Sequence, residues 1–157
     1  MSGRVLEIWT ATEGGAPMQA HDRIIAVAGT GLEGDRYATR AGSYSKPDEG
    51  PDRQLTLIAR EELEWLRVRH GITMTAGDSR RNILTEGTPL NDLVGARFSI
   101  GPVQVEGIRL CQPCKQRAVE LGFDFVHLML NRSGLNCRIV SGGPIAVGDL
   151  VAPPPGT

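Results

Sequence analysis

Two cysteines separated by two residues are the clearest candidates for chemistry in the chain. Cys111 and Cys114 stand in the segment Leu-Cys-Gln-Pro-Cys-Lys at 110–115, and their neighbours are polar. A cation and the start of a predicted helix follow the second thiol, and both stabilise its thiolate, the nucleophilic and metal-binding form. The pair therefore predicts a dithiol redox couple, half of a zinc site, or a single metal-ligating thiolate with a helper. The plain alternative is two small buried hydrophobic residues.

Zinc and thiol–disulfide exchange fit the pair less well. A structural zinc ion usually takes four ligands in two close pairs, whereas the further candidates, Cys137 and His127, are isolated in the sequence. Cys-x-Pro-Cys-Lys is similar to a thioredoxin active site, but that motif belongs near the start of a βαβ fold. Here it stands at 111–115 of 157 residues.

Arginines recur next to the predicted starts of strands, where several strands can bring them to one end of a sheet. Guanidinium groups bind phosphate bidentately, and neighbouring hydroxyl and amide groups can add neutral hydrogen bonds. The alternative is a set of solvated arginines paired with Asp35, Asp52 or Asp78. Together the residues predict an anion-binding site, made of Arg36, Arg53, Thr56, Arg80, Arg81 and Asn82.

The elements that must position these residues are mainly short strands. The 20 glycines and 10 prolines imply many turns, which favours strands over long helices. Strands are expected at 4–10, 24–28, 54–58, 83–85, 97–100, 103–110, 137–140 and 144–151. We expect an α+β, strand-rich fold: a mixed β-sheet curved into a barrel-like domain with a few short peripheral helices.

The clearest helix is predicted over Arg60–His70, with acidic residues near its start, basic residues near its end and Gly71 after it. Shorter helices are expected at 115–121 and 125–132, and a long exposed loop at 38–53. Glycines 29, 31 and 34 match a dinucleotide-binding pattern, but a proline-rich loop follows them instead of a helix, which excludes that fold.

Length and charge narrow the class of protein. The 157 residues suit one domain, and a net charge of -1 gives no long-range attraction to nucleic acid or anionic membranes. No run approaches the roughly 20 apolar residues of a membrane span. The first nine residues lack the apolar region of a secretory signal. With three cysteines, an odd number, a cytoplasmic protein with reduced thiols is expected.

Six motifs follow one another in a characteristic order. They are Gly-Leu-Glu-Gly-Asp-Arg (31–36), Arg-Gln-Leu-Thr-Leu (53–57), Arg-Arg-Asn-Ile-Leu-Thr-Glu-Gly (80–87), Leu-Val-Gly-Ala-Arg-Phe (93–98), Cys-Gln-Pro-Cys (111–114) and Gly-Gly-Pro-Ile-Ala-Val-Gly-Asp (142–149). This set resembles the MOSC domain, named for the C-terminal domain of molybdenum cofactor sulfurases. It is also similar to the cofactor domain of the mitochondrial amidoxime-reducing proteins. The resemblance implies a single domain over 1–157, with 152–157 as a tail.

The resemblance implies binding of the molybdenum cofactor (molybdopterin), or transport of sulfur destined for it. The cysteine shared by the family matches Cys114, which would ligate molybdenum, with Cys111 as accessory. The family's site motifs match Arg36, Arg53, Arg80 and Asn82. Soft thiolate suits molybdenum bound to dithiolene sulfur, and guanidinium suits the pterin phosphate.

The leading functional hypothesis is a molybdenum-cofactor-dependent oxidoreductase that reduces N-hydroxylated small molecules with electrons from a separate donor protein. Asp35 and Tyr37 are the candidate proton donors, although family members commonly carry His at the position of Tyr37. One alternative is a sulfur transferase or carrier of sulfur or of the cofactor. Others are a thiol–disulfide oxidoreductase that uses Cys111 and Cys114, and a cofactor-free structural domain. No nucleic acid or membrane partner is expected.

Overall fold

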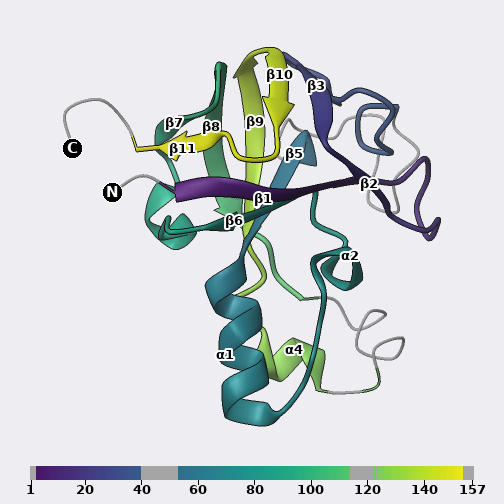
Figure 1. Ribbon diagram of the computed structural model, residues 1–157, viewed down its shortest axis with the longest axis vertical. Helices are drawn as coiled ribbons and strands as arrows, with labels where there is room; N and C mark the ends of the chain where they lie inside the picture. The colour runs from purple at the N-terminus through teal and green to yellow at the C-terminus, as the bar shows by residue number, and fades with distance from the viewer. Residues whose placement is uncertain (1–2, 40–52, 114–121, 123, 154–157) are drawn as a thin grey trace.

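Seven strands close into a mixed barrel in a computed structural model, which describes residues 3–39, 53–113, 122 and 124–153 (Figure 1). The strand order is β11-β7-β8-β9-β5-β6-β1, and pairing of β1 with β11 closes the ring. The β5–β6 pair is parallel and the other pairs are antiparallel. The barrel strands are β1 (Gly3–Thr10), β5 (Leu55–Ala59), β6 (Ile83–Glu86), β7 (Arg97–Ile100), β8 (Val103–Leu110), β9 (Leu135–Ser141) and β11 (Leu150–Ala152). The predicted strand-rich, barrel-like α+β fold is confirmed.

Four further strands extend the barrel. β2 (Gln19–His21) pairs with the end of β1, and a separate sheet has the order β10-β3-β4. Its strands are β3 (Arg23–Val27), β4 (Gly31–Leu32) and β10 (Gly143–Ala146). The three-stranded sheet lies beside one end of the barrel, next to β9 (Figure 1).

The barrel interior is filled almost entirely by aliphatic side chains. Along β5, Leu55 and Leu57 face this core, and Thr56 between them faces outward because successive strand residues point to opposite sides. Cys137 on β9 is fully buried in the same core. Among the described residues, Phe98 is the aromatic residue of this core. The small number of aromatic residues in the sequence is consistent with this packing.

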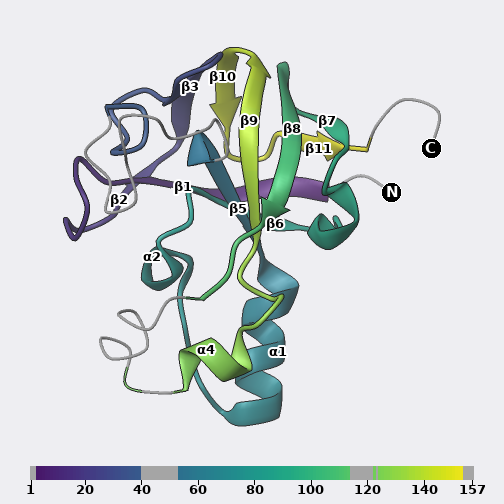
Figure 2. The same cartoon turned by 180° about the vertical axis from the view of Figure 1, so that it is seen from behind.

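A second apolar cluster lies outside the barrel and joins it to the helices. It contains Ile58, Leu66, Met74, Ala76, Leu84 and Met129. Helix α1 spans Arg60–His70, as predicted, and Gly71 ends it in the left-handed conformation at φ 65°. α1 and α4 (Phe125–Leu128) project from the same end of the barrel (Figure 2). Arg132, which follows α4 in the chain, contacts α1. It pairs with Glu62 at 2.9 Å, and its guanidinium carbon lies 3.6 Å from the centre of the Trp65 ring.

The structure departs from the sequence predictions in several short elements. The helix expected at 125–132 ends at Leu128, and Asn131 then adopts a left-handed conformation (φ 60°) that a helix cannot include. Helix α2 (Ala76–Ser79) and the 3₁₀ helix η2 (Leu90–Leu93) were not predicted. The helix expected at 115–121 and most of the loop expected at 38–53 lie outside the described residues.

No helix of the described segments combines the length and the apolar character that a bilayer crossing requires.

Candidate functional site

A buried ion pair between Asp35 and Arg36 forms the centre of the candidate site. Their side chains are 0% and 4% exposed, and Arg36 Nη1 lies 3.1 Å from Asp35 Oδ1. Asp35 also accepts hydrogen bonds from the backbone N–H groups of Ala11 (3.1 Å) and Tyr37 (3.4 Å). The guanidinium carbon of Arg36 lies 4.6 Å from the centre of the Tyr37 ring. These contacts compensate the removal of both charges from water.

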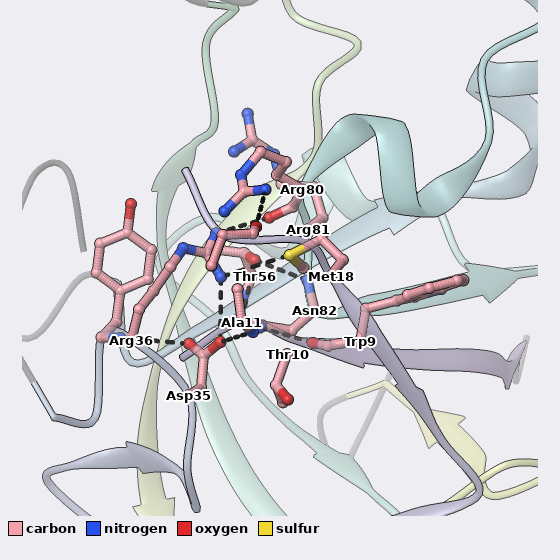
Figure 3. Close-up of polar contacts among 12 residues, drawn as sticks. Trp9, Thr10, Ala11, Met18, Asp35, Arg36, Thr56, Arg80, Arg81 and Asn82 are labelled. Carbon is pink, nitrogen blue, oxygen red and sulfur yellow. Dashed lines mark hydrogen bonds and ion pairs between the residues drawn. The ribbon is translucent and has the colours of Figure 1, made fainter. Parts of the chain in front are cut away.

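Arg36 also connects three distant segments of the chain. Its Nη2 donates to the backbone carbonyl of Arg80 at 2.9 Å, and its Nη1 lies 3.8 Å from Met18 Sδ. Arg80 Nη1 in turn donates to the carbonyl of Ala16 at 2.6 Å. The connection between β1 and β2 is therefore part of the site, and Figure 3 shows Met18 and Arg80 near the pair of Asp35 and Arg36.

Arg80 and Arg81 follow helix α2 and are half-buried. Arg80 is the C-cap residue of α2 and has a left-handed backbone (φ 59°), which is uncommon for a residue with a side chain. Arg81 Nε donates to the carbonyl of Ser133 at 2.8 Å. The two adjacent guanidinium groups thus donate to backbone carbonyls of two different segments, the β1–β2 connection and the segment before β9. Arg36, Arg80 and Arg81, together with Asp35, are called the arginine cluster below.

Asn82 and Thr56 form a buried polar bridge beneath the arginine cluster. Asn82 Oδ1 accepts from the backbone N–H and the hydroxyl of Thr56, at 3.0 and 3.1 Å. Asn82 Nδ2 donates to the carbonyl of Trp9 at 3.0 Å. The two side chains are 0% and 3% exposed. Their polar atoms therefore bind β1, β5 and β6 to one another.

Cys111 directly follows β8, which is separated from β5 by β9 in the barrel. It is buried, and its thiol donates to Asn136 Oδ1 at 3.3 Å. Asn136 is the register partner of Thr56 across β9 and β5. A polar row therefore runs over the outer face of the barrel from Cys111 through Asn136 and Thr56 to Asn82.

Of the other two cysteines, the structure describes Cys137. Cys114, the predicted metal ligand, lies outside the described residues. Cys137 is fully buried, and burial raises the pKa of its thiol well above the usual range, with the nearby Cys111 as a second cause. Within the described part of the chain, no three His, Cys, Asp or Glu side chains gather as a metal site would require.

The local charge of the site is opposite to that of the whole chain. The arginine cluster contains three guanidinium groups and one carboxylate, a formal charge of 3 − 1 = +2, whereas the protein carries -1. Arg53, the fourth predicted arginine, is half-buried two residues before β5, at the same end of that strand as Thr56. Such a concentration of positive charge favours an anionic ligand.

Sequence reasoning missed the parts of the site that are made of backbone and of small residues. The carbonyl of Ala16 and the thioether of Met18 contact the arginine cluster, but alanine and methionine in a turn carry no charge signal. Asn136 was also missed, although a polar residue inside an otherwise apolar strand pattern was a signal that could have identified it.

Comparison with known structures supports the barrel assignment. The YUAD protein from Bacillus subtilis has 19% identity and a TM-score of 0.78, with 96% of this chain and 94% of that chain covered. YiiM from Geobacillus stearothermophilus has 18% identity and a TM-score of 0.71, with 96% and 74% covered. YiiM from Escherichia coli has 22% identity and a TM-score of 0.69, with 97% and 69% covered. At these identities the similarity establishes the fold.

The family is established by sequence. A comparison with curated proteins finds no match. The MOSC domain profile, by contrast, matches residues 45–152, which include β5, the Arg80–Asn82 turn and both cysteines of the Cys-Gln-Pro-Cys motif. This range is more than two thirds of the chain. The protein therefore belongs to the MOSC domain family, which is generally linked to binding of the molybdenum cofactor.

Proposed function

We propose that this protein binds the molybdenum cofactor beside the arginine cluster and uses it to reduce N-hydroxylated small molecules. The observation that carries the proposal is the convergence of Arg36 with Arg80 and Arg81, from segments 44 residues apart, next to the polar row that ends at Cys111. The arginine cluster and Cys111, which are separate in sequence, thus lie on one wall of the barrel.

The types of donor on this wall fit the chemical demands of that cofactor. Its phosphate needs donors in a fork geometry, and Arg80 and Arg81 supply two guanidinium groups on one turn. Arg53 lies at the start of the adjacent strand. The molybdenum of the cofactor accepts soft thiolate, and Cys114 stands three positions after buried Cys111 in the chain. The bound cofactor would supply two-electron redox chemistry.

We assign the remaining predicted site residues supporting roles. Cys111 is accessory to Cys114, because its own thiol is buried against Asn136. Thr56 and Asn82 support the floor of the site, because their polar atoms are engaged with each other and with β1. Both oxygens of Asp35 accept hydrogen bonds inside the protein, so we favour Tyr37, which is half-buried beside it, as the proton donor.

The proposed reaction converts an N–OH group into N–H. Two electrons from a separate donor protein and two protons cleave the N–O bond, and the oxygen leaves as water. The arginine cluster binds and orients, and the buried aliphatic barrel behind it provides a rigid support.

Molybdenum content tests the binding half of the proposal. Protein made in a host that synthesises the cofactor should contain close to one molybdenum per chain by elemental analysis. Cys114→Ser should lose the metal, and Cys111→Ser should retain most of it. The control is Arg67→Ala, an exposed arginine on α1 paired with Glu64, which should leave metal content unchanged. Molybdenum-free wild-type protein from such a host would refute the proposal.

Two further measurements separate the alternatives. A carrier of sulfur or of the cofactor would contain molybdenum or a persulfide, yet would not turn over a hydroxylamine-type substrate with a chemical reductant. A thiol–disulfide oxidoreductase would lose as much activity in Cys111→Ser as in Cys114→Ser. The proposed reductase requires turnover and a much milder loss in Cys111→Ser.

A further inference from the structure

The outer face of strands β7, β8 and β9 carries an arginine-rich surface. Both neighbours of Arg138 on β9 face the apolar core, as does Phe98 next to Arg97 on β7. Because successive strand residues point to opposite sides, Arg97 and Arg138 face outward. Glu106 on β8 is the register partner of both, and Arg109, the other charged residue of β8, is exposed. We call Arg97, Glu106, Arg109 and Arg138 the arginine face.

The single carboxylate neutralises only part of the positive charge of this face. Glu106 Oε1 lies 2.9 Å from Arg138 Nη2, and its Oε2 lies 3.8 Å from Arg97 Nε. The three strands contain three arginines and one glutamate, a formal charge of 3 − 1 = +2. The rest of the chain therefore sums to -1 − 2 = -3. Helix α1, by contrast, has three arginines and three glutamates. Such a local excess of positive charge steers a negatively charged partner to the arginine face.

The arginine face adjoins the polar row that ends at Cys111. Arg109 is the register partner of Asn136, which in turn is paired with Thr56. Arg138 stands two residues from Asn136 on the same side of β9, about 6.7 Å along the strand. Figure 2 shows β8 and β9 side by side, with helices α1 and α4 beyond one end of the barrel rather than over these strands. A protein bound to the arginine face is therefore next to the wall that carries the proposed cofactor site.

The side chains of this face favour a transient, polar contact. Arg97 is 61% exposed and Arg138 is 35% exposed, so both can exchange water for carboxylates of a partner. None of the strongly exposed large apolar side chains of the described residues lies on β7, β8 or β9. Stable subunit interfaces are usually apolar, whereas encounters between redox proteins are small and transient. Two copies of this chain joined through this face about a twofold axis would also bring like charges together.

We propose that the arginine face is the docking surface of the protein that delivers electrons to this one, and that this partner is an acidic redox protein. Its task as electron donor rests on the proposed function, whereas the acidic character of its contact surface follows from the charge of the arginine face. In each turnover the partner is oxidised by two electrons in all, and the substrate N–OH group is reduced to N–H with release of water. Electrostatic complementarity mainly raises the association rate and sets specificity, which suits a donor that must bind, deliver electrons and leave.

Binding to an acidic plant-type [2Fe–2S] ferredoxin tests the surface. By isothermal titration calorimetry on the whole chain, wild-type protein should bind this ferredoxin at about 20 mM salt and more weakly at about 200 mM. Arg97→Gln/Arg109→Gln removes two charges, and at about threefold per exposed charge its affinity should fall roughly tenfold. The matched control is Arg67→Gln, because Arg67 is 56% exposed and paired with Glu64, much as Arg97 is paired with Glu106. This variant should bind ferredoxin as tightly as wild type.

Glu106→Gln reverses the sign of the expected effect. The change raises the charge of the arginine face from +2 to +3, so ferredoxin should bind about threefold more tightly. Damage to the strands would instead weaken binding, so a gain in affinity supports docking through charge. A basic cytochrome c that binds wild type as well as ferredoxin does would contradict the proposal. A thymidine oligonucleotide that binds more tightly than ferredoxin, with the same response to the variants, would assign the face to nucleic acid and overturn it.

Turnover distinguishes this inference from the proposed function. In cofactor-loaded protein that reduces a hydroxylamine-type substrate, the KM for reduced ferredoxin should rise about tenfold in Arg97→Gln/Arg109→Gln, while turnover driven by dithionite should equal that of wild type. Dithionite turnover with the same ferredoxin KM in every variant overturns the docking surface and leaves the proposed function intact. The expected charge dependence of ferredoxin binding in protein without molybdenum refutes the proposed function and supports the acidic docking surface. Absence of ferredoxin binding at low salt overturns the docking surface.

Discussion

Replacement of Asp35 by Asn tests whether the buried ion pair organises the site. The change keeps the shape of the side chain and removes its charge, so the guanidinium of Arg36 stays buried at 4% exposure without a counterion. Breaking one partner of a buried pair typically costs about 3–5 kcal/mol. Asn can still offer one oxygen to the N–H of Ala11, so we expect the lower part of this range, about 3 kcal/mol.

The assay is urea unfolding followed by circular dichroism. With a slope of about 2 kcal/mol per molar urea, a loss of about 3 kcal/mol lowers the midpoint by about 1.5 M at constant slope. The matched control is Glu64→Gln, which neutralises an ion pair whose members are 52% and 56% exposed on α1. Solvent screens that pair, so its midpoint should not change measurably. Equal midpoints for Asp35→Asn and wild type would refute the view that the pair is a structural centre.

Three further predictions concern the surroundings of the site. Asn82→Ala leaves two Thr56 donors without their acceptor and should destabilise by about 3 kcal/mol in urea; Asn91→Ala, at an exposed amide, is the control that should stay near wild type. Because burial raises the pKa of Cys137 in the folded state, unfolding makes its thiolate easier to form. Stability from this residue is retained below the unfolded pKa near 9.0 and lost as pH rises above it, and Cys137 should resist alkylation at pH 7 until denaturant is added, as mass spectrometry would show. Gly134→Ala would place a Cβ atom 1.9 Å from the carbonyl oxygen of Leu57 and should prevent soluble folding, whereas Gly148→Ala, with a similarly positive φ but open space, should only lower the Tm. Soluble Gly134→Ala protein with the Tm of Gly148→Ala would contradict this reasoning.

The elements with local signals were predictable from the sequence. Helix α1 follows from the charge distribution along 60–70 and the glycine after it, and both bounds are confirmed. The hairpin of β7 and β8 follows from two apolar runs around Gly101 and Pro102, and its bounds are confirmed as well. Each of these signals acts between residues close in the chain, where propensity and hydrogen-bonding partners are set by neighbours.

The kinds of residue in the site could also be predicted from the sequence, although their geometry could not. Arginine, aspartate and cysteine identify the kinds of group available for anion and metal binding, and the ordered motifs identify the family. No feature of the sequence indicates that Arg80 has a left-handed backbone, or that the carbonyls of Arg80 and Ala16 accept from guanidinium groups. Backbone acceptors are the same at every residue, so residue type cannot reveal them.

Contacts between distant segments decide which of these groups meet. The segment after β4 brings Arg36 to Arg80 across 44 positions, and the pairing of β5 with β9 sets Asn136 beside Thr56 across 80. The sequence by itself determined which side chains the protein has and which short segments become strands or helices. Only the tertiary structure decided that Arg36 is enclosed and that Arg80 and Arg81 are half-buried, because burial depends on what the rest of the chain packs against each residue.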